Sequence, residues 1–150
     1  MSVQHGSPGA LWQQLEVLVG RWTVEASLES VVAGTATFEW ALDHQVLLWR
    51  MTIPNPVPDS FSVISANSDG QSFTQHYFDA RGVARIYAMS LEGDTWTLRR
   101  DQPDFTPLDF SQRFVGSIAS DGNAIEGAWE RAEKNSTWRK DFDLVYCRSE

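Results

Sequence analysis

Eleven residues form a pattern that could hold a small amphipathic ligand. Arginine and lysine bind carboxylates and phenolates, tyrosine and glutamine form hydrogen bonds, and tryptophan covers flat hydrophobic groups. The residues recur with a period of two, on strand faces that also carry large apolar side chains. A sealed core would not accept three cations, because an unpaired buried charge is strongly destabilising. We therefore predict a cavity lined by Arg85, Arg100, Lys140, Gln75, Gln112, Tyr77, Tyr87, Trp49, Trp96, Trp129 and Trp138.

The same cavity could serve binding or catalysis. A binding protein would hold the anionic or polar group of a hydrophobic or aromatic ligand. A cyclase, isomerase or dehydratase would use Tyr87 or Tyr77 as the acid, with Arg85 or Lys140 stabilising developing negative charge. A third interpretation is a barrel that acts through association of its outer surface. We assign no catalytic residue from the sequence, because function depends on the site and not on the fold.

The histidines do not predict a metal site. His5, His44 and His76 lack the close spacing of zinc ligands. His76 falls on the strand face opposite Tyr77, so we expect it to point outward, and His44 follows Asp43 in a predicted turn. The chain also lacks a nucleophile elbow, a phosphate-binding loop and a dinucleotide fingerprint. We therefore predict neither a metal nor a cofactor.

The closing segment predicts a β-hairpin. In its second arm, residues 137–146, Lys140 falls on the apolar face between Trp138 and Phe142. The other face groups Asp141 and Asp143 with Arg139, which favours a solvated row of salt bridges. An inward lysine is typical of a polar cavity.

The rest of the chain supplies the strands that would position these residues. Turn signals recur every eight to twelve residues, as in an antiparallel barrel or sandwich. We predict a turn at Ala33-Gly34, and loops at 54–58 and 102–109 that could gate the cavity. About ten strands are predicted, at residues 21–29, 35–40, 46–52, 61–66, 72–79, 83–90, 95–101, 110–117, 125–130 and 137–146.

One short helix precedes the strands. Ser7 can cap it, Pro8 suits its first turn, and apolar residues follow at helical spacing until Gly20. We predict a helix over residues 8–19 that covers one end of the barrel, with residues 1–7 flexible. The predicted fold is thus a single all-β domain over residues 1–150, an antiparallel up-and-down β-barrel.

Composition excludes several classes of partner. The chain has 150 residues, 42% hydrophobic content and a formal net charge of −8, which disfavours nucleic acid. Its single cysteine allows no intrachain disulfide. We see neither a signal peptide nor an apolar run long enough for a membrane span, and we predict a cytoplasmic protein. The oligomeric state stays open, a homodimer included.

The segment Gly20-Arg21-Trp22 resembles the Gly-x-Trp signature of calycins, the superfamily of lipocalins and fatty-acid-binding proteins. This resemblance implies that Trp22 packs across the narrow end of the barrel under the helix. It also implies that a late arginine, either Arg139 or Arg148, lies over Trp22. The strand count and the lack of disulfides are more similar to fatty-acid-binding proteins and nitrobindins than to secreted lipocalins. Fatty-acid-binding barrels hold carboxylates with an arginine and a tyrosine.

A longer set of segments, within roughly residues 15–148, resembles small uncharacterised bacterial proteins of the DUF1579 type. That resemblance implies a calycin-like barrel and supplies no activity. Nitrobindins bind haem through a histidine near the end of the chain, whereas the last two predicted strands contain none. This difference argues against haem binding by that route, and a haem-binding, nitrobindin-like protein is kept only as the third alternative. The segments are residues 77–83 with Arg85 and Tyr87, Phe114 to Gly116, Asp121-Gly122, residues 125–130 and residues 141–146.

Overall fold

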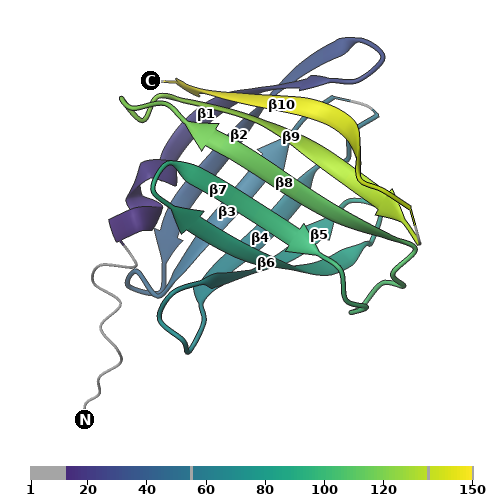
Figure 1. Ribbon diagram of the computed structural model, residues 1–150. Helices are drawn as coiled ribbons and strands as arrows, with labels where there is room; N and C mark the ends of the chain where they lie inside the picture. Colours follow the sequence, from purple (N-terminus) through teal and green to yellow (C-terminus); the bar gives the residue numbers. More distant parts are fainter. Residues whose placement is uncertain (1–12, 55, 135, 150) are drawn as a thin grey trace.

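Antiparallel pairing between strands adjacent in sequence, with β10 closing on β1, produces a ten-stranded barrel (Figure 1). The computed structural model describes residues 13–54, 56–134 and 136–149. The predicted fold class is confirmed. The strands are β1 (Gly20–Ser27), β2 (Val31–Ala41), β3 (Val46–Thr52), β4 (Ser60–Ala66), β5 (Phe73–Asp79), β6 (Ala84–Glu92), β7 (Thr95–Arg100), β8 (Phe110–Ile118), β9 (Ala124–Glu133) and β10 (Arg139–Ser149).

The largest error in the strand prediction concerns Gly34. We predicted a turn at Ala33-Gly34, but β2 runs straight through this position and pairs with β1 on one side and β3 on the other. Gly34 is needed there for space, because a Cβ atom would overlap the carbonyl oxygen of Thr52. Glycine inside a strand can mark a close backbone approach as well as a turn.

The described part of the predicted helix covers one end of the barrel (Figure 1). Residues 13–15 are α-helical and continue into the 3-10 helix η1 (Glu16–Leu18). Leu15 and Leu18 are fully buried, so this segment closes the barrel with its apolar side chains. The predicted helix start at residue 8 and the predicted flexible residues 1–7 lie outside the described residues.

Trp22 and Arg148 connect the helix to the barrel. Trp22 is fully buried and donates its indole N–H to the carbonyl of Leu18 at 2.9 Å. The guanidinium carbon of Arg148 lies 4.2 Å from the centre of the Trp22 ring. Arg148 also donates to the carbonyls of Val17 and Val19 at 2.6 and 2.7 Å. Arg148, not Arg139, therefore fills the position that the calycin resemblance implies.

Aromatic side chains fill the half of the barrel next to this helix. Trp96 is fully buried and contacts Phe38, Phe114 and Tyr146, with ring centres 5.2–6.1 Å apart. Gly127 leaves room for Phe114, since a Cβ atom there would lie 2.6 Å from the Phe114 ring. This half is a packed core.

Among the described residues, no helix is long and apolar enough to cross a membrane.

Candidate functional site

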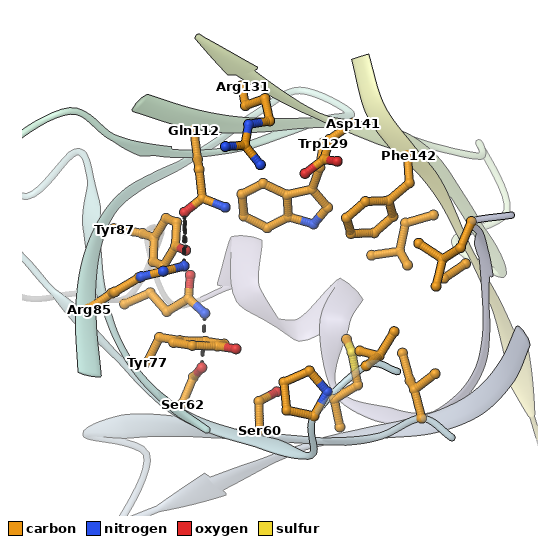
Figure 2. A pocket seen from close by; sticks show the side chains of 18 of the residues that line it. Ser60, Ser62, Tyr77, Arg85, Tyr87, Gln112, Trp129, Arg131, Asp141 and Phe142 are labelled. Atoms are coloured by element: carbon orange, nitrogen blue, oxygen red, sulfur yellow. Dashed lines mark hydrogen bonds between the residues drawn. The ribbon is translucent and has the colours of Figure 1, made fainter. Parts of the chain in front are cut away.

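The other half of the barrel holds a cavity of about 360 Å³ (Figure 2). Its size falls in the range of small-molecule sites. The strands that line it pack into the core with one end and face the cavity with the inward residues nearer the other end. In β5 the inward series Phe73, Gln75 and Tyr77 passes from the core into the cavity. The cavity is therefore a continuation of the core in which larger apolar residues give way to polar ones.

The cavity has two unlike walls. Strands β4, β5, β6, β8 and β9 supply a polar wall, which consists of Ser60, Ser62, Gln75, Tyr77, Arg85, Tyr87, Gln112 and Arg131, together with the rings of Phe110 and Trp129. Strands β10, β1 and β3, with the loop after β3, supply an apolar wall of Leu144, Phe142, Ala26, Leu28, Trp49, Met51, Ile53, Pro56, Val57 and Pro58. We use these two names, polar wall and apolar wall, for these sets below.

Arg85 lies at the centre of the polar wall. It donates from Nη1 to Oε1 of Gln112 at 3.3 Å, and Tyr87 donates its hydroxyl to the same oxygen at 2.8 Å (Figure 2). The Nε atom of Arg85 is buried and has no hydrogen-bond partner among the described residues. No carboxylate within that part of the chain forms a salt bridge with Arg85, unlike Arg81 and Arg131. Arg85 therefore keeps a positive charge and several donors to offer to a ligand.

Burial raises the pKa of the Tyr87 hydroxyl. The phenol therefore stays protonated at neutral pH, where it serves as a hydrogen-bond donor. Its ring stands edge-on to Trp129 and to Tyr77, with ring centres 5.6 and 5.9 Å apart. These contacts fix the orientation of the Tyr87 ring in the wall.

Tyr77, Asp79 and Arg81 form a hydrogen-bonded cluster beside the cavity. Asp79 accepts from the Tyr77 hydroxyl at 2.6 Å and from Nη2 of Arg81 at 2.6 Å. Burial alone would raise the pKa of Asp79, but hydrogen bonds from Arg81 and Tyr77 outweigh it and lower the pKa to about 2. Burial and the Asp79 charge together raise the pKa of Tyr77. The charge of Arg81 is thus balanced within the cluster.

The guanidinium groups of two arginines lie against the ring of Phe110. The guanidinium carbon of Arg131 lies 3.9 Å from the ring centre and that of Arg85 lies 5.9 Å from it. Arg131 also pairs with Glu133 at 2.8 Å, which balances its charge. The ring face thus supports both cations at the cavity.

Four cavity-lining residues have a buried polar atom without a hydrogen-bond partner in the described part of the chain. They are Gln75, whose Oε1 is an acceptor, and Arg85, Trp49 and Tyr146, whose Nε, Nε1 and hydroxyl are donors. An unpaired buried polar atom costs about 1–3 kcal/mol. A ligand with matching groups would recover this energy on binding.

The predicted inward position of Lys140 is wrong. A β-bulge between Lys140 and Phe142 breaks the alternation of β10. Lys140 is 60% exposed and pairs with Asp143 at 3.1 Å, while Asp141 lines the cavity (Figure 2). A bulge adds one residue to a strand and shifts the face of the residues beside it. It replaces a predicted cation at the cavity by an anion.

Arg100 does not line the cavity, contrary to prediction. It is 2% exposed, as expected for an inward residue, but its side chain pairs with Asp104 at 2.8 Å. The Arg100 guanidinium also donates to the carbonyl of Thr106 at 2.7 Å. Arg100 therefore anchors the loop between β7 and β8 instead of facing the cavity.

Two of the predicted wall tryptophans also lie elsewhere. Trp96 belongs to the packed half, because its position near the start of β7 faces the helix-covered core. Trp138 precedes β10, where its ring lies 4.1 Å from the guanidinium carbon of Arg113 and 5.4 Å from that of Arg99. Neither ring lines the cavity.

The structure brings the other seven predicted residues together around the cavity: Gln75, Tyr77, Arg85, Tyr87, Gln112, Trp49 and Trp129. The sequence prediction missed Arg131, although it continues the alternation of Trp129 by one step. It also missed Phe110 and Phe142 as site residues, although both fall on inward faces. Residues 56–58 line the cavity, within the loop 54–58 that was predicted as a possible gate, whereas no local signal in the sequence places Arg81 there.

Neither described histidine lines the cavity. His76 pairs in register with Val63 and Ile86 on the face opposite the lining residues of β5. His44 lies in the turn after β2, with its ring 4.9 Å from that of Trp40. The described histidines therefore do not fit haem ligation inside the barrel, and His5 lies outside the described residues.

Comparison with known proteins supports the fold alone. No family model matches the chain, and no curated protein is significantly similar in sequence. The DUF1579-type resemblance therefore stays a prediction. The chain is similar in structure to Rv2717c from M. tuberculosis, with a TM-score of 0.69 and 12% sequence identity over 92% of this chain and 96% of that one. An identity this low shows a shared barrel architecture and carries no activity across.

Proposed function

We propose that this protein binds a small amphipathic molecule in the hollow half of the barrel, with an anionic group held by Arg85. The observation that carries this proposal is the unbalanced charge of Arg85 on the polar wall. The whole chain has a formal net charge of −8, so a cation without a carboxylate partner stands out. A ligand carboxylate would supply that partner through charge-assisted hydrogen bonds.

The apolar wall explains the rest of the proposed ligand. Met51, Phe142 and Leu144 face the cavity from the side that lacks charged residues other than Asp141 at the bulge. Burial of an apolar ligand surface against them stabilises a complex by about 25 cal/mol per Å². The cavity volume equals that of about a dozen water molecules at roughly 30 Å³ each, which suits a compound of one or two rings.

The enzymatic alternative has less support. Its acid would be Tyr87 or Tyr77, but burial raises the pKa of both phenols and makes proton donation harder. Of the two groups that could stabilise developing negative charge, Lys140 lies outside the cavity and only Arg85 lines it. The proposal also includes the predictions that the protein acts in the cytoplasm and has neither a nucleic-acid nor a membrane partner.

Ligand binding can be tested with Trp129 as the reporter, since its ring lines the cavity. Native mass spectrometry of protein purified from its host would first reveal any retained small molecule. Tryptophan fluorescence would then be titrated with a panel of aromatic and aliphatic carboxylates. We expect Arg85→Gln to weaken binding about tenfold or more, because it removes a charge-assisted hydrogen bond.

Arg50→Gln is the matched control for Arg85→Gln. Arg50 lies on the outer face, 52% exposed, and pairs with Glu39 at 3.1 Å. It removes the same charge from the protein without touching the cavity, so its affinity should match the wild type. The proposal fails if no carboxylate binds, or if both variants bind with wild-type affinity.

A further inference from the structure

We propose, building on the binding function above, that the ligand is a flat ring compound with an anionic oxygen and a hydroxyl on the same edge. A hydroxylated aromatic carboxylate is the simplest member of this class. The polar edge would face the polar wall, and the opposite edge would face the apolar wall. A fatty acid differs, because its polarity lies at one end and its chain is apolar on every side.

The distribution of polar groups favours an edge over an end. On β5 and β6, polar residues continue from the inner part of the cavity to its outer part, with Gln75 and Tyr87 paired in register and Tyr77 and Arg85 paired beyond them. The apolar wall shows no such pairs, since β3 presents Trp49 and Met51 and the loop after it presents Ile53. An alkyl chain running inward from Arg85 would lie along hydrogen-bonding groups on one side.

Gln75 requires a donor from the ligand. It is 2% exposed, and its Nε2 donates to the hydroxyl of Ser62 at 2.9 Å. Its Oε1 is buried without a partner among the described residues. A carbonyl oxygen of this kind accepts from a ligand hydroxyl and has no use for a carboxylate or an alkyl group.

Arg85 requires an acceptor close to that donor. Gln75 pairs directly with Tyr87, and Arg85 lies two residues from Tyr87 on the same face of β6. Diagonal neighbours of this kind in a sheet lie about 7–8 Å apart. One ring system can therefore present an anionic oxygen to Arg85 and a hydroxyl to Gln75.

The aromatic side chains provide room for such a ring. Trp129 stands edge-on to Tyr87 on the polar wall, and Phe142 lines the cavity from the neighbouring strand (Figure 2). Aromatic rings prefer edge-to-face and offset stacking, which adds to the energy of simple burial. An aromatic ligand gains these contacts, whereas an aliphatic ligand of equal volume does not.

Three probes distinguish these ligand classes: naphthoate, its hydroxynaphthoate isomers, and decanoate. Each would be titrated into wild-type protein, Gln75→Met and Arg85→Gln by calorimetry. We expect at least one hydroxynaphthoate to bind about tenfold or more tightly than naphthoate, because it satisfies the Gln75 carbonyl. Gln75→Met should bring this ratio close to one, because it removes the carbonyl that accepts from the ligand hydroxyl. Arg85→Gln should weaken both aromatic probes about tenfold or more.

Arg50→Gln, on the outer face, is again the control for structural disturbance, because it changes a polar side chain without touching the cavity. It should retain the preference for the hydroxylated probe. The ligand class is overturned if every hydroxynaphthoate binds no better than naphthoate, if Gln75→Met keeps the ratio, or if decanoate binds more tightly than every ring compound. These results leave the proposed binding function intact as long as carboxylate binding depends on Arg85. Failure of all the carboxylates to bind would instead refute the function itself.

Discussion

The two halves of the barrel use the same strands and the same alternation, yet one half is packed and the other is hollow. In β6, the inward residues Leu91 and Met89 belong to the packed half, while Tyr87 and Arg85 line the cavity. In β8, Phe114 fills the core and Gln112, two residues away, faces the cavity. A change of side-chain type along one strand face therefore separates core from site, without any change in backbone pattern.

The largest expected difference in stability comes from replacing one tryptophan by alanine in each half of the barrel. Trp96→Ala should destabilise the protein by about 4 kcal/mol, because Trp96 is fully buried among aromatic rings. Trp129→Ala should cost less than about 2 kcal/mol, because Trp129 is only partly buried beside the cavity. Urea unfolding followed by circular dichroism measures both values. Equal costs would mean that the two halves are packed alike.

The two ion pairs at the end of β7 provide the next contrast. Asp104→Asn should destabilise the protein by about 3 kcal/mol, because the Arg100 guanidinium would stay buried without its counter-charge. Asp101→Asn should cost less than about 1 kcal/mol, since the Arg99–Asp101 pair is about half exposed. Urea midpoints at neutral pH would show the difference. A similar small cost for both would contradict a structural role for the Arg100–Asp104 pair.

The cluster of Tyr77, Asp79 and Arg81 should give a smaller, pH-dependent effect. The pKa of Asp79 in the folded state, about 2, lies below its ordinary value of 3.8, so the Asp79 carboxylate stabilises the folded state above about pH 4. That contribution is lost as the pH falls toward 2. Asp79→Asn should therefore cost roughly 1–2 kcal/mol at neutral pH and progressively less between pH 4 and pH 2. Urea midpoints across this range test it, and a pH-independent difference would contradict it.

The smallest effects are expected at the bulge in β10. Lys140→Gln should change stability by less than about 0.5 kcal/mol and leave naphthoate affinity unchanged, because Lys140 is exposed. Asp141→Asn should tighten naphthoate binding a few-fold, since it removes a negative charge from the cavity. Calorimetry compares the two variants. If Lys140→Gln weakened naphthoate binding and Asp141→Asn left it unchanged, Lys140 and not Asp141 would have to face the cavity.

Much of the fold was predictable because period-two alternation and turn residues are local signals. The boundaries of β3, Val46–Thr52, match the predicted ones, and β5 differs from its prediction by one residue. The turn predicted at Gly34 was wrong because the glycine is needed to avoid a clash with Thr52, a residue on the neighbouring strand. Sequence pattern alone does not distinguish these two uses of glycine.

The site was predictable only where alternation held without interruption. Gln75, Arg85 and Gln112 reached the cavity as expected, because β5, β6 and β8 show no irregularity around these residues. The bulge at Asp141 reversed the assignment of Lys140. Arg100 faces the interior but pairs with Asp104, four residues further along the chain, through a loop conformation that no short pattern encodes.

Fluorine NMR of the protein labelled with fluorotryptophan tests the central claim most directly. Seven tryptophans give seven signals, which single Trp→Phe variants would assign. On adding naphthoate, the account predicts that the signals of Trp129 and Trp49, which line the cavity, shift most. The signal of Trp138, stacked on Arg113, should not move. Shifts confined to Trp138 and Trp40, with Trp129 unmoved, would contradict a ligand site in the hollow half of the barrel.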